Sequence, residues 1–134
     1  MKGVLKIELE KHMSEYGNLV FGESDKGIPF SIERIYYIYG VSGTTRRGFH
    51  AHKNLKQVLL CVNGSCEILL DDGSSKEIII LNEPNKGISV EGVIWREMYN
   101  FTEGTVLLVL ASDYYNEEDY IRNYDEFLMY IKGV

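Results

Sequence analysis

Apolar and polar residues alternate along much of this chain, and that alternation is typical of strands with one buried face. The first example runs from Val4 to Glu10, where leucine or isoleucine alternates with a charged residue from Leu5 onward. Similar runs, and runs of β-branched and aromatic residues, predict further strands at residues 17–23, 30–39, 57–62, 66–71, 77–81, 88–91, 93–99 and 105–111. Turns containing Gly, Asn or Asp separate these runs. The pattern therefore predicts an all-β sandwich or small barrel.

Two stretches depart from simple alternation. Residues 57–62 are apolar on both faces, so we expect the core to cover one face and a second subunit to cover the other. From Asn116 onward, acidic residues follow a good N-cap, and apolar residues recur at mostly helical spacing as far as Ile131. We expect short C-terminal helical segments that pack on the sheet.

The chain of 134 residues is expected to form one domain, residues 1–134, with a core that needs neither disulfides nor a structural metal. No apolar run approaches the roughly 20 residues needed to cross a bilayer, and the N-terminus lacks the apolar core of a signal peptide. We therefore expect a cytoplasmic protein with no membrane partner. Cys61 and Cys66 flank an Asn63-Gly64 turn that would place them opposite each other in a hairpin, where a cross-strand disulfide could form. In a reducing cytosol we expect two buried free thiols instead.

The candidate chemistry gathers at His50-Ala51-His52. On a strand, the period of two puts both imidazoles on one face, about 6 to 7 Å apart. Four cations surround the pair although the net charge of the chain is -6: Arg46, Arg47, Lys53 and Lys56. A basic rim on an acidic protein favours a small anionic ligand and argues against a nucleic acid partner. The two histidines could be structural, could bind a metal ion, or could transfer protons near neutral pH.

This segment resembles the first motif of the cupins, which is His-x-His, three or four residues, Glu, six residues and Gly. Here four residues separate His52 from Gln57 and six separate Gln57 from Gly64, so the spacing fits but an amide replaces the acid. Cupins that bind metal take a third histidine from a second motif, and the corresponding residues 83–99 contain none. Two good ligands are too few for a tight divalent site, so we expect no metal and no cofactor. The resemblance implies a cupin-type double-stranded β-helix, which is a jelly-roll barrel.

A longer resemblance, to the dTDP-sugar 3,4-ketoisomerases, covers almost the whole chain. It rests on ordered motifs: Arg34-Ile35-Tyr36-Tyr37-Ile38-Tyr39, Arg47-Gly48-Phe49-His50-Ala51-His52-Lys53, Gln57, Asp71-Asp72-Gly73, Trp95-Arg96-Glu97-Met98, Val106-Leu107-Leu108-Val109-Leu110-Ala111-Ser112 and Tyr120-Ile121-Arg122. The resemblance implies a cupin-fold isomerase that moves the keto group of a dTDP-linked 4-keto-6-deoxyhexose from C4 to C3. It also implies a homodimer, and a product that is later aminated to 3-amino-3,6-dideoxyhexoses for lipopolysaccharide or S-layer glycans.

The implied reaction needs no cofactor, because the ketone already acidifies the hydrogen at C3. A base, a proton donor and hydrogen bonds to a cis-enediolate are sufficient. His50 and His52 are the predicted proton-transfer pair, and either of them can be the base. Tyr37 is the candidate for an additional donor to the enediolate. Arg47 and Lys53 are expected to neutralise the diphosphate.

The remaining predicted contacts surround the sugar and the nucleotide. Gln57, at the position of the cupin carboxylate, should point into the barrel and orient a histidine or the sugar. Trp95 is expected either in the core or as a wall for the sugar or the thymine. Arg34, Arg96 and Tyr16 complete the predicted substrate-binding residues. Side chains of this kind at the pocket mouth could decide the configuration of the product at C4.

Two other functions compete with this one. A related cupin that epimerises nucleotide sugars at C3 and C5 would be expected to carry a histidine–aspartate pair and a catalytic tyrosine, which the His-Ala-His motif fits less well. A non-catalytic cupin would only bind a sugar or act as a regulator. The net charge of -6 and the lack of a recognisable helix-turn-helix argue against a DNA-binding regulator.

Overall fold

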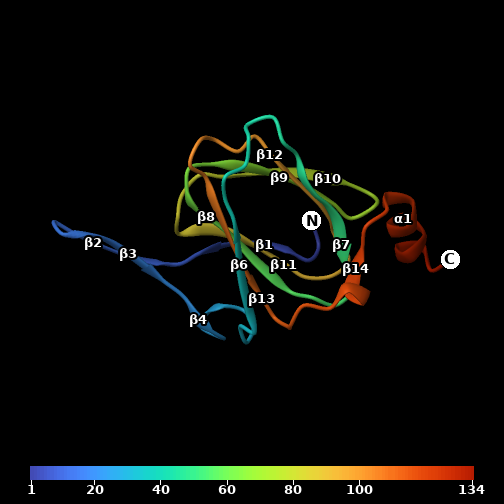
Figure 1. Ribbon diagram of the computed structural model, residues 1–134. Coiled ribbons are helices and arrows are strands. Elements are labelled where there is room, and N and C mark those ends of the chain that lie inside the picture. Colours follow the sequence, from blue (N-terminus) through green and yellow to red (C-terminus); the bar gives the residue numbers. More distant parts are fainter.

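Two five-stranded sheets face each other in a barrel, and the computed structural model describes the whole chain, residues 1–134 (Figure 1). The first sheet has the order β1-β11-β8-β13-β6, formed by Val4–Glu8, Lys86–Val90, Gln57–Asn63, Val106–Ala111 and Arg34–Ile38. The second has the order β10-β9-β12-β7-β14, formed by Lys76–Leu81, Cys66–Asp71, Trp95–Tyr99, Arg47–His52 and Tyr120–Ile121. Every pairing within these two sheets is antiparallel. The predicted all-β jelly-roll fold is confirmed.

The main core fills the space between the two sheets and follows from the alternation along each strand. On β13, Leu107 and Val109 are fully buried, whereas Leu108 between them is only half-buried. Directly opposite residues of neighbouring strands share a face, so the interior positions of β13 continue onto Leu59 of β8 and Tyr36 of β6. Burying such apolar faces contributes most of the stability of a barrel of this size.

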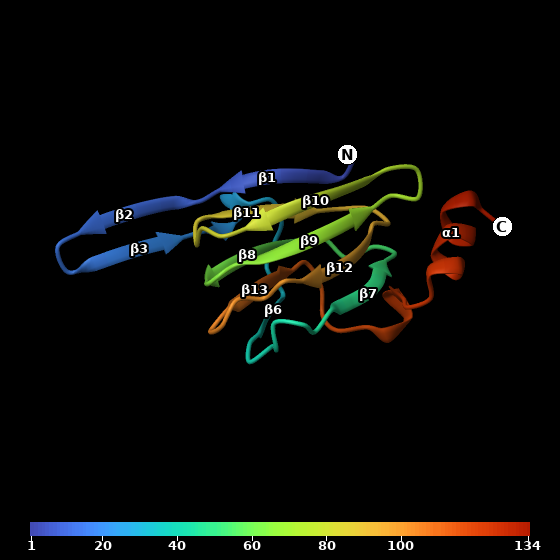
Figure 2. The same ribbon diagram turned by 90° about the horizontal axis from the view of Figure 1, so that it is seen from above.

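The two ends of the molecule carry different attachments, which Figure 2 shows on opposite sides of the barrel. At one end, β2 (Glu10–Ser14) and β3 (Gly17–Phe21) form a hairpin that projects away from the sheets. The short parallel strands β4 (Glu23–Ser24) and β5 (Gly27–Ile28) follow it. At the other end, helix α1 (Tyr124–Lys132) begins after its N-cap and packs beside β7 and β14.

The segment before β6 is not strand, although its composition predicted one from residue 30. Phe30 instead joins Leu9 and Ile28 in a small cluster over the outer face of β8, against Val58 and Leu60. The chain itself therefore covers part of the second apolar face of β8, which we had assigned to another subunit. Tertiary burial outweighs β-propensity in this segment.

The Asn63-Gly64 segment does not close a hairpin, because β8 and β9 belong to different sheets. It carries the chain from one sheet to the other, and Gly64 has a φ of 74° that suits glycine. The predicted cross-strand pairing of Cys61 and Cys66 is therefore wrong. Both cysteines are nevertheless buried free thiols, as the sequence predicted.

The C-terminal segment is only partly helical. Asn116 caps a single 3-10 turn, Glu117–Asp119, and the α-helix starts after a second cap, Asn123. Tyr120 and Ile121, which we expected in a helix, form β14 and pair with His52 and Ala51 at the edge of the second sheet. Backbone hydrogen bonds to that edge stabilise a strand here more than the helical spacing of the side chains would stabilise a helix. No helix of the structure has both the length and the apolar character needed to span a membrane.

Candidate active site

His50 and His52 lie side by side on the interior face of β7, as the period of two predicted. Their ring centroids are 4.9 Å apart and their planes are nearly perpendicular. Tyr120 of β14 lies against both rings, with centroid distances of 5.2 and 4.4 Å. His52 is fully buried, whereas His50 reaches the edge of a pocket. The two imidazoles are therefore not equivalent, because only His50 can meet a ligand directly.

The carboxylate of Asp119 fixes the imidazole of His52, which is the more deeply buried of the two histidines. Nδ1 of His52 lies 2.9 Å from Oδ2 of Asp119, and the other carboxylate oxygen accepts the backbone N–H of Asn54 at 2.7 Å. An ionised carboxylate only accepts, so Nδ1 carries the proton and Nε2 of His52 is the bare nitrogen. Nε2 of His50 and Nε2 of His52 are both buried without a partner. Unpartnered basic nitrogens of this kind are the groups that a proton-transfer site requires.

Both imidazoles are neutral at physiological pH. Burial, and then the nearby guanidinium of Arg96, lower the pKa of His50 to about 4, while a hydrogen bond to the backbone of Gly48 opposes the shift. Burial and Arg96 likewise lower the pKa of His52. A neutral imidazole can accept a proton, and the imidazolium that forms in this environment returns the proton readily.

A chain of hydrogen bonds runs through the barrel interior from Arg96 to Tyr36. Arg96 donates from Nη1 to Oε1 of Gln57, and Nε2 of Gln57 donates to the hydroxyl of Tyr36 at 3.0 Å. A guanidinium can only donate, so it fixes the orientation of the Gln57 amide. The amide in turn uses a lone pair of Tyr36 and leaves the phenolic hydrogen free. Because burial raises the pKa of Tyr36, the phenol keeps that hydrogen at neutral pH.

Arg96 is a buried cation without a carboxylate partner. Its Nε and Nη2 donate to the carbonyl of Ile94 at 3.2 and 3.1 Å. Burial lowers its pKa to about 10, so it remains charged at neutral pH. The interior thus offers two imidazoles, one neutral amide and one fixed cation. This donor set does not fit a divalent metal, because the guanidinium repels a cation and the amide replaces the acidic ligand.

A pocket of about 400 Å³ opens beside His50. Its wall contains three arginines, three tyrosines and no acidic residue: Arg34, Tyr36, Tyr37, Ile38, Arg47, Gly48, His50, Met98, Tyr120 and Arg122. Arg122 is paired with Glu117, but Arg34 and Arg47 have no carboxylate partner, so the wall attracts an anion on a protein that is otherwise acidic. The pocket therefore combines an anion-binding wall with an imidazole base and a phenol.

The prediction for Tyr37 needs correction. Tyr37 contributes to the pocket rim, but its side chain is on the outer face of β6, where it is 59% exposed and neighbours Tyr39. Tyr36 lies on the interior face, opposite Val109 of β13. The candidate donor is therefore Tyr36, because successive strand residues point to opposite faces.

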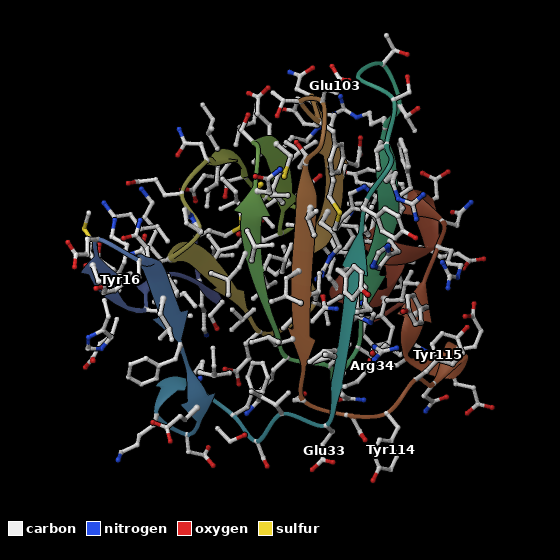
Figure 3. The ribbon with its side chains drawn as sticks, turned by 60° about the vertical axis from the view of Figure 1, so that its left-hand side comes forward. Tyr16, Glu33, Arg34, Glu103, Tyr114 and Tyr115 are labelled. Carbon is white, nitrogen blue, oxygen red and sulfur yellow. The ribbon has the colours of Figure 1, made fainter.

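Three other predicted residues lie away from the pocket. Trp95 packs in a cluster with Phe127 of α1, which agrees with the core alternative and not with a wall for the ligand. Lys53 follows β7 and lies over the ring of Tyr130 at 5.6 Å. Tyr16 is at the tip of the β2–β3 hairpin, which Figure 3 shows on the far side of the molecule from Arg34. Within one chain, Tyr16 therefore cannot contact the pocket.

The remaining predicted residues lie in or beside the pocket. Arg34 and Arg47 line it, and Gln57 points into the barrel as expected. Arg96 lies behind the wall, at hydrogen-bonding distance from Gln57. Arg34 also stacks on Tyr36 at 5.5 Å.

Four side chains of this site were not predicted from the sequence: Tyr36, Asp119, Tyr120 and Arg122. The last three follow or end the 3-10 turn, in a segment that we expected to be helical, so their position beside β7 had no sequence signal beyond the Tyr120-Ile121-Arg122 motif. Arg122 stacks on Tyr120 at 4.1 Å and donates to Glu117 at 2.6 Å. This pairing holds the third arginine at the pocket.

Comparison with known proteins shows which family the chain belongs to. The model of the family described as FdtA, WxcM-like, C-terminal, matches residues 2–132. The chain is 51% identical over 128 residues to the TDP-4-oxo-6-deoxy-alpha-D-glucose-3,4-oxoisomerase of Aneurinibacillus thermoaerophilus, covering 96% of this chain and 92% of the relative. A histidine-to-asparagine mutant of the 3,4-ketoisomerase from Thermoanaerobacterium thermosaccharolyticum, solved with TDP-4-keto-6-deoxyglucose, is 46% identical with a TM-score of 0.97 over 99% of this chain and 96% of that chain.

A more distant structure shares only the fold. The 4-keto-6-deoxy sugar epimerase from Streptomyces spheroides is 18% identical, with a TM-score of 0.74 over 89% of this chain and 68% of that chain. The family match and the two high identities are decisive by comparison. The chain therefore belongs to the FdtA, WxcM-like family, as its ordered motifs indicated.

Proposed function

We propose that this protein is a TDP-4-keto-6-deoxyglucose 3,4-ketoisomerase. The observation that carries the proposal is that His50 and Tyr36 both line one pocket, where Nε2 of His50 has no partner and Tyr36, which accepts from Gln57, keeps its phenolic hydrogen free. The wall of that pocket holds three arginines and no acid, which suits a sugar linked to a diphosphate. The 3,4-ketoisomerase relatives support the same activity.

His50 is the base in this proposal, because it alone of the two imidazoles lines the pocket. Nε2 of His50 takes the proton from C3, and the electron pair of that bond forms the C3–C4 double bond of an enediolate with its charge on O4. The proton on O3 then moves to O4, C4 takes the proton from the imidazolium, and the carbonyl forms at C3. His52, held by Asp119, is a positioning residue that packs against His50 from behind.

Tyr36 donates its phenolic hydrogen to the developing negative charge on the enediolate. This role explains why Gln57 stands where cupins carry an acid. A carboxylate at that position would accept from both Arg96 and Tyr36, and the phenolic hydrogen would then point away from the pocket. The amide accepts from Arg96 and donates to Tyr36, so it keeps that hydrogen available.

The arginines of the wall bind the diphosphate in this proposal. Arg34, Arg47 and Arg122 come from β6, β7 and the segment after β14, so three separate elements converge on one anion. Planar guanidinium groups match phosphate oxygens in pairs, which favours arginine over lysine for this contact. We place the reaction in the cytoplasm. Because nucleotide-linked keto sugars are precursors for amination, we assign it to the synthesis of 3-amino-3,6-dideoxyhexoses.

The proposal includes a homodimer. A groove of about 810 Å³ is lined mostly by apolar residues of the hairpin and of the outer faces of β8 and β13. An apolar surface of this kind favours a protein interface, and the projecting hairpin has the extended shape to lie along the same groove of a second copy. Such an arrangement would carry Tyr16 from its own chain toward the partner's pocket and would reconcile its exposed position with a substrate contact.

Sedimentation tests the dimer directly. We expect the wild-type protein to sediment as a dimer, and Leu108→Asp, in the groove, to shift it to a monomer. The matched control is Ile78→Asp, which places the same charge on the exposed edge strand β10, outside the groove. A wild-type monomer at micromolar concentration would contradict this part of the proposal.

One observation favours the epimerase as a second candidate. His52 pairs with Asp119 and Tyr120 lies beside both, which is the pair and the tyrosine that we expected of a 3,5-epimerase. The presence of this pair therefore does not separate the two reactions. Of the two histidines with a bare Nε2, only His50 lines the pocket, and His50 has no carboxylate partner, which favours the ketoisomerase.

The deciding experiment is incubation with TDP-4-keto-6-deoxyglucose in heavy water, followed by NMR. A ketoisomerase yields a 3-keto product, with deuterium at C4 to the extent that the His50 imidazolium exchanges its proton with solvent before it protonates C4. An epimerase labels C5, and a binding protein leaves the sugar unchanged. Prior dialysis against a strong chelator is expected to leave the rate unchanged. Label at C5, an unchanged sugar, or a rate that only added zinc or iron restores would contradict the proposal.

A further inference from the structure

Strand β7 contains a bulge directly before His50. Opposite it on β12, Arg96 faces His50, Glu97 faces Gly48 and Met98 faces Arg47, with a shift of register between Arg96 and Glu97. Two residues of β7, Gly48 and Phe49, therefore occupy the space of one, and Phe49 has no partner of its own.

The bulge changes the face on which Arg47 lies. In an uninterrupted strand, residues three apart point to opposite faces, so Arg47 would point out of the barrel when His50 points in. Arg96 and Met98 are both buried on the interior face of β12, and directly opposite residues share a face. Because Arg47 is opposite Met98, the bulge brings it to the same face as His50, where it lines the pocket.

The backbone at the bulge is unfavourable for ordinary residues. Phe49 has a φ of 56° and Gly48 a φ of 94°, and a bulky residue is rarely found at positive φ. A Cβ on Gly48 would lie 2.8 Å from the carbonyl oxygen of Arg96, which is closer than real contacts of this kind. Strain of this sort persists where the surrounding structure requires the conformation, and it gathers at functional sites.

The bulge also contacts the base. The backbone of Gly48 lies beside the imidazole of His50 and raises the pKa of His50 against the effect of burial, and Nε2 of that imidazole has no partner. The bulge residues therefore lie between the two pocket side chains of β7 and influence the orientation of both.

We propose that the Gly48–Phe49 bulge is a positioning device that turns Arg47 into the pocket to bind the diphosphate of the substrate. This inference rests on the proposed function, in which Arg47 is one of three diphosphate ligands. It adds that the backbone conformation of two residues, and not the side chain of Phe49, decides whether that ligand is present.

The test measures the dissociation constant of TDP by calorimetry, which does not depend on catalysis. Arg47→Ala is expected to weaken TDP binding about tenfold, which is the effect of losing one charge-assisted contact. Gly48→Val should remove the bulge, turn Arg47 outward and weaken binding to the same extent. The double variant Gly48→Val with Arg47→Ala should bind TDP no more weakly than either single variant, because both changes remove the same contact.

Deletion of Phe49 provides the reverse control. Without the extra residue, Gly48 takes the outward position and Arg47 remains on the interior face in a regular strand. The variant that lacks Phe49, alone or combined with Gly48→Val, should therefore bind TDP within about threefold of wild type. Phe49→Gly, which keeps the bulge and relieves the strain, should also bind normally and should melt at a higher temperature.

The outcomes separate this inference from the proposed function. If Arg47→Ala leaves TDP binding unchanged, the diphosphate contact of the proposed function is wrong. If Arg47→Ala weakens binding but folded Gly48→Val does not, the bulge has no positioning role. If deletion of Phe49 weakens binding as much as Arg47→Ala, the inference is likewise overturned, and this arm holds even where Gly48→Val fails to fold.

Discussion

The interior of this barrel has a polar end and an apolar end, and both are built by the same strands. Gln57 of β8 hydrogen-bonds Arg96 and Tyr36, whereas Leu59 and Cys61, two and four residues later on the same face, join a wholly apolar cluster. Alternation along β8 is the same at both ends. The difference arises from the neighbouring strands, because at the polar end β12 and β6 place Arg96 and Tyr36 beside Gln57.

The polar end lowers the stability of the folded protein. A guanidinium, an amide and two imidazoles are buried there beside the half-buried phenol of Tyr36, and burying such groups is unfavourable unless each is hydrogen-bonded. The two imidazole Nε2 atoms are not hydrogen-bonded. The apolar end must therefore supply the stability that the polar end lacks, and substitutions at the two ends should affect different properties.

A large effect is expected at the polar end, for Tyr36→Phe. Removing the phenolic hydroxyl takes away the donor to the enediolate, so kcat should fall about 10²- to 10³-fold while TDP affinity stays near wild type. Tyr37→Phe is the matched control on the outer face of the same strand and should retain kcat within about twofold. The comparison is measured by steady-state kinetics. A larger loss for Tyr37→Phe than for Tyr36→Phe would return the role to Tyr37.

The apolar end should show the opposite behaviour, with Ile68→Ala as its test. Ile68 is fully buried in the main core, so its truncation should lower the free energy of unfolding by about 3 kcal/mol. Urea unfolding measures this loss, and kcat per folded molecule should remain within about twofold of wild type. A loss of kcat without a loss of stability would show that the two ends are not separate.

A smaller effect is expected for Gln57→Glu, which keeps the shape of the side chain. The carboxylate would accept from both neighbours, so the hydrogen of Tyr36 would turn away from the pocket and kcat should fall about 10- to 100-fold. Because the new carboxylate can pair with Arg96, the melting temperature should not fall. Full activity in this variant would mean that the orientation of the amide has no catalytic consequence.

The smallest effect is the dependence of stability on pH at His50. Its pKa is about 4 in the folded protein, below the unfolded value of about 6.5. Between these values the unfolded chain binds a proton that the folded chain does not, so acidification favours unfolding. From pH 7 to pH 5, His50 should account for a loss of about 1–2 kcal/mol of unfolding free energy.

Urea unfolding of wild type and of His50→Asn at pH 7 and pH 5 measures the contribution of His50 to this loss of unfolding free energy. The variant should lose less stability on acidification than wild type, by about 1–2 kcal/mol. Replacement of the exposed His12 by Asn is the matched control and should leave the loss as in wild type. Identical losses in His50→Asn and wild type would contradict the low pKa of the buried imidazole.

Alternation alone predicted most of the strands and the shared face of His50 and His52, because strand geometry fixes the face from local sequence. The same rule would have corrected the choice of tyrosine. Arg34 and Tyr36 are two residues apart and share a face, so the choice of Arg34 for the pocket favoured Tyr36 as the interior tyrosine and placed Tyr37 on the opposite face. The choice of Tyr37 was therefore inconsistent with a pattern that was already available.

The rest of the site depends on contacts between distant residues. Asp119 lies 67 positions from His52 in the chain, and only the pairing of β14 with β7 brings them together. No local pattern predicts such a pairing, because the helical spacing of the C-terminal segment favoured a different structure. The bulge had one local indication, the glycine at position 48, but its register is visible only against β12.

The most direct test compares His50→Asn with His52→Asn, since in the proposed mechanism the histidine at the pocket transfers the proton. Both rates of conversion of TDP-4-keto-6-deoxyglucose are measured by NMR, with TDP affinity as the control for an intact pocket. We expect His50→Asn to lose at least about 10³-fold in kcat and His52→Asn to lose about 10- to 100-fold, because His52 acts through His50. A variant His50→Asn that is more active than His52→Asn would contradict the assignment.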